Sequence, residues 1–182
     1  MSRLESGIER LRLWDSALCI RFNGAVRIAP VCGLFRVVSR LGDGVFWYSL
    51  MLALLGTGWT SAVGPVARMV ATGVVCTLIY KWLKSKTSRP RPFAVETAVR
   101  AGADPLDPFS FPSGHTLHAV AFSVVAIAFY PMLAWVLVPF TLLVAASRVV
   151  LGLHYPSDVL AATLIGFALA TTSLWVTASW IA

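Results

Sequence analysis

His115 lies where a polar turn meets a long apolar run, in a setting that favours anion binding. It follows Pro112, Ser113 and Gly114, and these residue types are typical of the N-cap and first turn of a helix. Free backbone N–H groups at a helix start attract negative charge, and glycine lets a ligand approach the backbone closely. The imidazole adds a group that carries a proton near neutral pH. This stretch therefore predicts a helix start that binds an anion.

A second histidine, His154, precedes Asp158 by four residues. A carboxylate that accepts one ring N–H of a histidine fixes its tautomer and leaves the other ring nitrogen free to attack. His115, on a different helix start, could then protonate the departing oxygen. Two histidines with separate roles favour a hydrolase over a simple binding site.

Three cations flank the apolar runs: Lys84, Arg91 and Arg148. Arginine forks bind phosphate oxygens in pairs, and lysine acts as a point charge. Lys84 alone could be an interfacial anchor, whereas Arg148 ends an apolar run and would be costly unless paired. Such fixed positive charge could stabilise a phosphoryl transition state without a metal. The sequence also lacks the grouped carboxylates that magnesium needs, so we predict no metal and no cofactor.

The composition requires a membrane to hold these groups. Hydrophobic residues make up 58% of the 182 and charged residues only 13%. The runs 44–67, 116–147 and 159–182 are each long enough to cross a bilayer, which takes about 20 residues. Helices satisfy their own backbone there, so we expect an all-α, multi-pass transmembrane bundle. The net charge of +7 lies beside apolar segments and in one loop, so anionic membrane lipids rather than nucleic acid are the expected partners.

We divide the apolar sequence into five spans. They are Gly44 to about Trp59, about Ala62 to Trp82, Ser113 to Tyr130, Met132 to about Val150, and Asp158 to the C-terminal Ala182. A sixth crossing would have to use Ala25 to Leu41, whose three arginines make a span expensive. We therefore interpret that segment as interfacial or as a hairpin.

The N-terminal region shows helical periodicity. Apolar residues recur at helical spacing at Leu4, Ile8, Leu11, Trp14 and Leu18. This pattern predicts an amphipathic helix, either on the membrane surface or packed on the rest of the protein. We accordingly expect an interfacial segment over 1–42 and a transmembrane domain over 43–182.

Alternation of the five spans brings the chemical groups together. The second and fourth spans end, and the third and fifth begin, on one side of the membrane. The histidines, the cations and Asp158 can therefore meet there. Asp104 and Asp107 are expected to shape turns in the only long polar loop, Lys81 to Phe111. His118, one turn beyond His115, is interpreted as a packed or pore-lining residue that could border the substrate path.

Three motifs resemble those of the type 2 phosphatidic acid phosphatase (PAP2) superfamily, in its bacterial membrane lipid phosphatase branch. They are Lys84-x6-Arg91-Pro92, Pro112-Ser113-Gly114-His115 and Ser147-Arg148-x5-His154-x3-Asp158. The resemblance implies that His154 is the nucleophile that forms a phosphohistidine, that Asp158 orients it and that His115 is the general acid. It implies that the phosphate is held by Lys84, Arg91, Ser113, Gly114 and Arg148, and that hydrolysis needs no metal. Bacterial members usually have six spans rather than five.

We therefore expect a metal-independent lipid phosphate phosphatase in the bacterial inner membrane. Its substrate would be a polyprenyl diphosphate, a phosphatidic acid, a phosphatidylglycerol phosphate or a lipid A phosphate. The alternative is a transporter or scramblase that binds lipid phosphate without catalysis. Five spans would place the basic N-terminal segment on the side of the site, which the positive-inside tendency makes cytoplasmic, whereas related bacterial enzymes mostly act on the outer face. The sequence does not indicate an oligomeric state.

Overall fold

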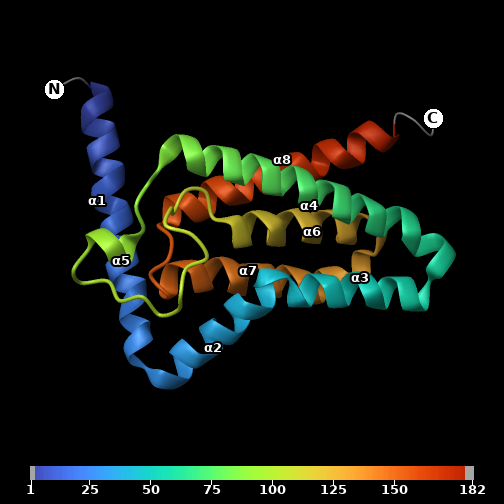
Figure 1. Cartoon of the computed structure of the whole chain (residues 1–182), viewed down its shortest axis with the longest axis horizontal. Coiled ribbons are helices and arrows are strands. Elements are labelled where there is room, and N and C mark those ends of the chain that lie inside the picture. Colours follow the sequence, from blue (N-terminus) through green and yellow to red (C-terminus); the bar gives the residue numbers. More distant parts are fainter. Residues whose placement is uncertain (1–2, 179–182) are drawn as a thin grey trace.

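The chain forms a bundle of helices (Figure 1). The computed structural model describes residues 3–178, and within them the only β-type pairing is an isolated bridge between Pro90 and Phe109. The elements in order are α1 Arg3–Asn23, η1 Gly24–Arg27, α2 Ala29–Arg40, η2 Leu41–Val45, α3 Phe46–Thr57, α4 Trp59–Thr87, α5 Pro92–Val95, α6 Gly114–Phe129, η3 Pro131–Leu133, α7 Ala134–Val150 and α8 Pro156–Ala178. The predicted all-α fold is confirmed.

Helix α6 lies at the centre of the bundle, between α4, α7 and α8 (Figure 1). Its residues Leu117, Ala121 and Val125 are fully buried. Gly166 of α8 faces α6 so closely that a Cβ there would lie 2.6 Å from the backbone oxygen of Leu117. Small residues let helices approach in this way where lipid supplies no hydrophobic drive between them. This packing fixes the start of α6 relative to the start of α8.

The outside of the bundle is apolar, as a lipid-facing surface must be. Exposed side chains include Leu52, Leu78, Trp135 and Leu164, each more than 60% accessible. Within residues 3–178, four segments are long and apolar enough to cross a bilayer: Ala29–Thr57, Thr60–Thr87, Pro131–Val150 and Pro156–Val176. Helix α6 is shorter and lies among them. The protein is therefore an integral membrane protein, while the number of crossings stays a prediction.

The arginine-containing segment before Gly44 forms one helix and not a hairpin. Pro30 lies in the first turn of α2, where its missing N–H costs nothing. It continues through the π-helical turn η2 into α3, with a kink at Gly44, where φ is 130°. The first apolar segment therefore starts at Ala29, earlier than the predicted Gly44. The division into 1–42 and 43–182 falls inside η2 and stays a prediction.

Helix α1 lies across one end of the bundle, roughly perpendicular to the long helices (Figure 1). Its buried side carries Asp15, Cys19 and Asn23, spaced by one turn. Leu11 and Trp14, from the predicted apolar face, are more than half exposed. The side chains of Leu4 and Ile8 lie outside the described residues. The helix thus packs on the protein through a polar side and directs apolar residues outward.

Candidate active site

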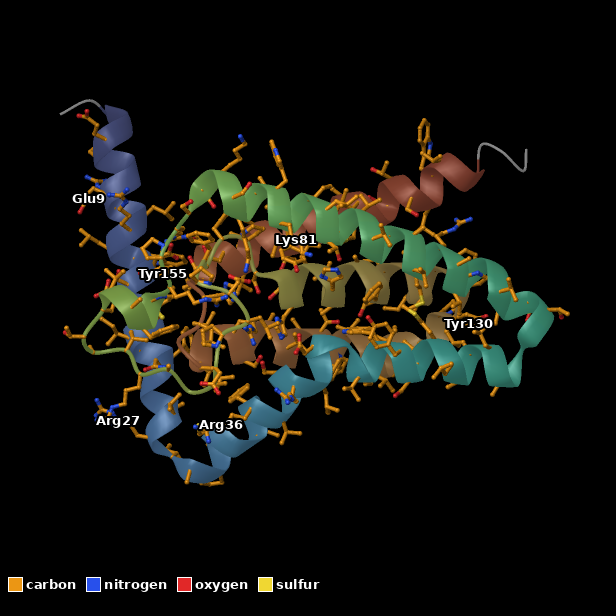
Figure 2. All side chains as sticks on the ribbon, in the orientation of Figure 1. Glu9, Arg27, Arg36, Lys81, Tyr130 and Tyr155 are labelled. Carbon is orange, nitrogen blue, oxygen red and sulfur yellow. The ribbon has the colours of Figure 1, made fainter. Side chains whose placement is uncertain are left out.

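The predicted meeting point of helix ends is present at the α1 end of the bundle. The end of α4, the start of α6, the end of α7 and the start of α8 all lie there, and the loop over residues 88–113 crosses them (Figure 1). Tyr155, beside His154, lies at this end, whereas Tyr130 lies at the opposite end (Figure 2). Residues far apart in the sequence therefore share one region.

A cavity of about 830 Å³ opens at this end, and most of the predicted site residues line it. They are Lys84, Arg91, Gly114, His115, Arg148 and His154. The cavity continues along α3, α4 and α6, where Trp47, Met51, Val70 and Phe122 form apolar walls. Ser113 and Asp158 do not line it. The site thus joins a cationic end to an apolar channel.

The imidazole of His154 is buried and oriented from both sides. Its Nδ1 lies 2.5 Å from the backbone oxygen of Ser110, and because a carbonyl can only accept, Nδ1 carries the proton. Its Nε2 faces Nη1 of Arg91 at 3.2 Å and is therefore the nitrogen with the free electron pair. Burial, followed by the positive charges of Arg148 and Arg91, lowers the pKa of His154 well below its ordinary value. The ring is neutral and its Nε2 faces the cations.

Asp158 has a different contact from the one we expected. We predicted that its carboxylate accepts the ring N–H of His154, but Oδ2 lies 3.8 Å from Nδ1, and the carbonyl of Ser110 takes that hydrogen bond. Asp158 is completely buried, and its Oδ2 accepts the backbone N–H of Tyr155 at 2.8 Å. The carboxylate therefore acts on His154 through its charge at close range, and the tautomer is fixed by the main chain.

Arg91 and Lys84 both bind Asp107. The Nζ of Lys84 lies 2.5 Å from Oδ2, and Nη2 of Arg91 lies 3.1 Å from Oδ1. Burial disfavours the charged carboxylate, but the hydrogen bond and charge of Lys84 and the charge of Arg91 outweigh it and lower the pKa of Asp107. Asp107 also accepts the N–H of Phe109, so it shapes a turn as predicted. The ionised carboxylate of Asp107 therefore binds the same Lys84 and Arg91 side chains that we predict to bind phosphate.

Arg148 is the third cation and is 3% exposed. One of its terminal nitrogens donates to the hydroxyl of Ser39 on α2. Its buried Nε has no hydrogen-bond partner among the described residues. Buried donors are nearly always satisfied, so this nitrogen at the cavity wall favours an anionic ligand.

His115 has a carboxylate partner that the sequence did not suggest. Its Nε2 lies 3.4 Å from Oδ1 of Asp43, which belongs to the π-helical turn η2. Nδ1 of His118, one turn along α6, donates to the carbonyl of Gly114 at 2.9 Å, and its Nε2 lies 3.1 Å from the hydroxyl of Thr77. Because it also lines the cavity, His118 is packed and cavity-lining at once.

Ser113 is the N-cap of α6, as its position in the sequence predicts. Its hydroxyl accepts from the N–H of Thr116 at 3.4 Å and pairs with the Thr116 hydroxyl at 2.9 Å. The side chain is fully buried, and Ser113 does not line the cavity. Only Gly114 and His115 of this motif reach the cavity wall, so Ser113 shapes the start of α6 that presents them.

A second, polar cavity of about 650 Å³ meets the first at His115 and Arg148. Arg36 and Arg40 of α2 lie along it, together with Asp104. The shared residues give the site an apolar opening on one side and a polar opening on the other.

The fold and this buried cationic cavity define a membrane protein of one recognisable class. A profile of the PAP2 superfamily matches residues 62–181, and the chain belongs to this superfamily. It is 35% identical over 125 residues to the undecaprenyl-diphosphatase BcrC of Bacillus subtilis, covering 65% of this chain and 63% of that protein. It is 30% identical over 142 residues to an undecaprenyl-diphosphatase of Sulfolobus acidocaldarius, covering 77% and 68%.

A solved structure shares the fold. It is the transmembrane PAP2 type phosphatidylglycerolphosphate phosphatase from Bacillus subtilis, with a TM-score of 0.76 and 23% identity. The superposition covers 93% of this chain and 87% of that one. The similarity therefore extends beyond the three motifs to the whole bundle.

Proposed function

We propose that this protein removes a terminal phosphate from an anionic membrane lipid by way of a phosphohistidine at His154. One observation carries the proposal: His154 and His115, from different helix starts, line one cationic cavity whose other wall is apolar. The family membership and the diphosphatase activity named for two relatives support it. A lipid phosphate would place its charged end at the cations and its chains along α3 and α4.

In the first step, Nε2 of His154 attacks the terminal phosphorus, and the bond from phosphorus to the bridging oxygen breaks. His115 donates its proton to that oxygen, which leaves as the lipid alcohol or lipid monophosphate. The new phosphoimidazolium keeps its Nδ1 proton on the carbonyl of Ser110 and lies beside the charge of Asp158. Asp43, 3.4 Å from Nε2 of His115, and the incoming phosphate both bring negative charge to this ring, which favours its protonation before transfer.

In the second step, water reaches the phosphohistidine through the polar cavity that His115 borders. His115 takes a proton from the water as the oxygen attacks phosphorus. The bond from phosphorus to Nε2 breaks, inorganic phosphate leaves, and His154 returns to its neutral form. The proton balance closes because His115 regains the proton that it gave to the leaving group.

Lys84, Arg91, Arg148 and the backbone of Gly114 hold the phosphate oxygens in this scheme. The three cations offset the charge on the transferring group in a site with little water. The ion pairs of Asp107 with Lys84 and Arg91 must break as phosphate binds, because the phosphate uses the same N–H donors. Ser113 contributes by holding the start of α6.

A polyprenyl diphosphate or a simple glycerophospholipid phosphate fits best, in the inner membrane of a bacterium. The apolar part of the cavity accommodates chains, whereas the bundle offers no additional domain among residues 3–178 for an elaborate headgroup. The relatives that are named undecaprenyl-diphosphatases favour the first of these substrates.

The test is phosphate release in detergent with EDTA present, from a polyprenyl diphosphate, a phosphatidylglycerol phosphate and a phosphatidic acid. We expect release by the wild-type protein, at least a thousandfold loss in His154→Ala and His115→Ala, and loss of no more than about tenfold in the control His118→Gln. Binding of the lipids without release by the wild-type protein would instead support a transporter or scramblase. Release that requires an added divalent ion would contradict the metal-free mechanism.

A further inference from the structure

Helix α1 supplies a buried carboxylate to the neighbourhood of the site. Asp15 is 1% exposed, although it lies in a surface helix far from the three motifs in the sequence. Its Oδ1 accepts the backbone N–H of Ser157 at 2.9 Å, and its Oδ2 accepts the Ser157 hydroxyl. Ser157 lies in the first turn of α8, where backbone N–H groups lack helical partners. Asp15 therefore caps α8 from another helix, directly before Asp158.

Arg89 joins Asp15 to Asp158. Its Nη2 donates to Oδ2 of Asp15 at 2.9 Å, and its Nη1 donates to Oδ1 of Asp158 at 2.6 Å. Its guanidinium also lies 4.1 Å from the ring centre of Tyr155. Burial disfavours its charge, but Asp158 and Asp15 outweigh that effect and raise the pKa of Arg89. The guanidinium of Arg89 thus bridges the two buried carboxylates of Asp15 and Asp158.

The division of contacts on Asp158 depends on this arrangement. Arg89 binds Oδ1 with one nitrogen only, because its other terminal nitrogen is held by Asp15. The second oxygen, Oδ2, accepts the N–H of Tyr155 at 2.8 Å and lies 3.8 Å from Nδ1 of His154. A guanidinium with both terminal nitrogens free prefers to bind one carboxylate with two parallel hydrogen bonds. Such a fork would compete with the N–H of Tyr155 for Oδ2 and draw that oxygen away from His154.

We propose that Asp15 is a positioning residue, which holds Arg89 in a single-contact geometry so that Asp158 keeps one oxygen directed at His154. The proposal rests on the phosphatase function described above. It makes the interfacial helix α1 part of the catalytic apparatus and not only a membrane anchor. It also gives Arg89, inside the first motif but outside its pattern, a defined task.

The principal variant is Asp15→Asn, which keeps the shape and one acceptor, for the backbone N–H of Ser157, but removes the charge that holds Arg89. The matched control is Glu9→Gln, because Glu9 lies on the same helix and is exposed (Figure 2). We expect Asp15→Asn to lower kcat by roughly 10- to 100-fold, by analogy with the loss caused when the hydrogen-bonded partners of metal-binding histidines are removed. Glu9→Gln should stay within about twofold of wild type.

Two further measurements separate positioning from a general structural role. Inhibition by inorganic phosphate reports the cations that line the cavity, so its inhibition constant should change less than threefold in Asp15→Asn. In an Arg89→Gln background, adding Asp15→Asn should cause no further loss of kcat, because Asp15 acts through Arg89. Additive losses, or a phosphate inhibition constant that rises with the loss of kcat, would overturn the proposal.

Folding is checked by the thermal unfolding midpoint in detergent. If Asp15→Asn does not fold, the substitute variant is Asp15→Glu. It retains the charge but displaces Arg89 through its longer side chain, so it should also lower kcat. Wild-type kcat in either folded variant would overturn the positioning role while leaving the phosphatase function intact. Absence of phosphate release by the wild-type protein itself would overturn both.

Discussion

Replacing Arg91 by lysine tests the geometry of the site most sharply, because charge is kept and only the fork is removed. The guanidinium donates to the backbone oxygens of Asp107 and Leu153, each at 2.8 Å. It also contacts the Asp107 carboxylate at 3.1 Å and Nε2 of His154 at 3.2 Å. It is 2% exposed, so water cannot replace these contacts readily.

The magnitude follows from the hydrogen bonds to the transferring phosphate that a lysine cannot make. An ammonium on a flexible stem can replace some of those of Arg91 but cannot match the planar fork. Removing two hydrogen bonds to a charged donor costs about 3 to 6 kcal/mol, at about 1.5 to 3 kcal/mol each. If partial rearrangement recovers a third of this, the net cost is about 2 to 4 kcal/mol. The corresponding decrease in kcat/KM is roughly 30- to 900-fold.

The assay is steady-state phosphate release from a micellar lipid phosphate by Arg91→Lys. The matched control is Arg100→Lys, since Arg100 is an exposed arginine that binds Asn23 through its backbone N–H and carbonyl. We expect the control to stay within about twofold of wild type. If Arg91→Lys retained wild-type kcat/KM while folded, the fork would not hold Nε2 or the phosphate, and the assigned role of Arg91 would be refuted.

Three further outcomes are expected. Asp43→Asn should lower kcat about tenfold, because it removes the carboxylate 3.4 Å from His115 and weakens the general acid; an unchanged rate of leaving-group release would contradict this. Gly152→Ala should lower the free energy of unfolding by about 2 to 5 kcal/mol, since it combines a side chain at a φ of 71° with a Cβ 2.8 Å from the backbone oxygen of Arg100; an unchanged thermal midpoint would refute that reasoning. Because the pKa of His154 is lowered in the folded protein, the unfolded state binds the extra proton below about pH 6.5, and stability should fall by up to about 1.4 kcal/mol per pH unit on acidification. His154→Gln should therefore show a shallower decrease of its thermal midpoint between pH 6 and pH 5 than wild type, and equal slopes would count against a buried neutral ring.

The long helices were predictable because a bilayer imposes length and apolarity on a sequence. The predicted spans near Ala62, Ser113, Met132 and Asp158 correspond to α4, α6, α7 and α8. The prediction was wrong for Ala25 to Leu41 as a hairpin, because Arg36 and Arg40 lie in helix α2, which continues into α3; the interfacial alternative stays a prediction. Arginines near a helix end can reach polar surroundings, which lowers their cost.

The meeting of the motif residues at one end of the bundle was predictable, whereas their contact partners were not; the roles of these residues stay predictions. Helix alternation brings Arg91, Arg148 and His154 to one end from local patterns alone. The contact of Asp15 with Ser157 spans 142 residues of sequence, and no local pattern indicates it. The acceptor role of Ser110 likewise depends on a backbone carbonyl, which any residue type could supply.

The central claim is that His154 carries the phosphoryl group. The direct measurement is a rapid-quench reaction with a lipid substrate radiolabelled in its terminal phosphate, stopped in alkali and followed by peptide mapping. We expect label on Nε2 of His154 within one turnover, and no label in His154→Ala. Label on another residue, or full phosphate release within that time without any labelled enzyme, would contradict it.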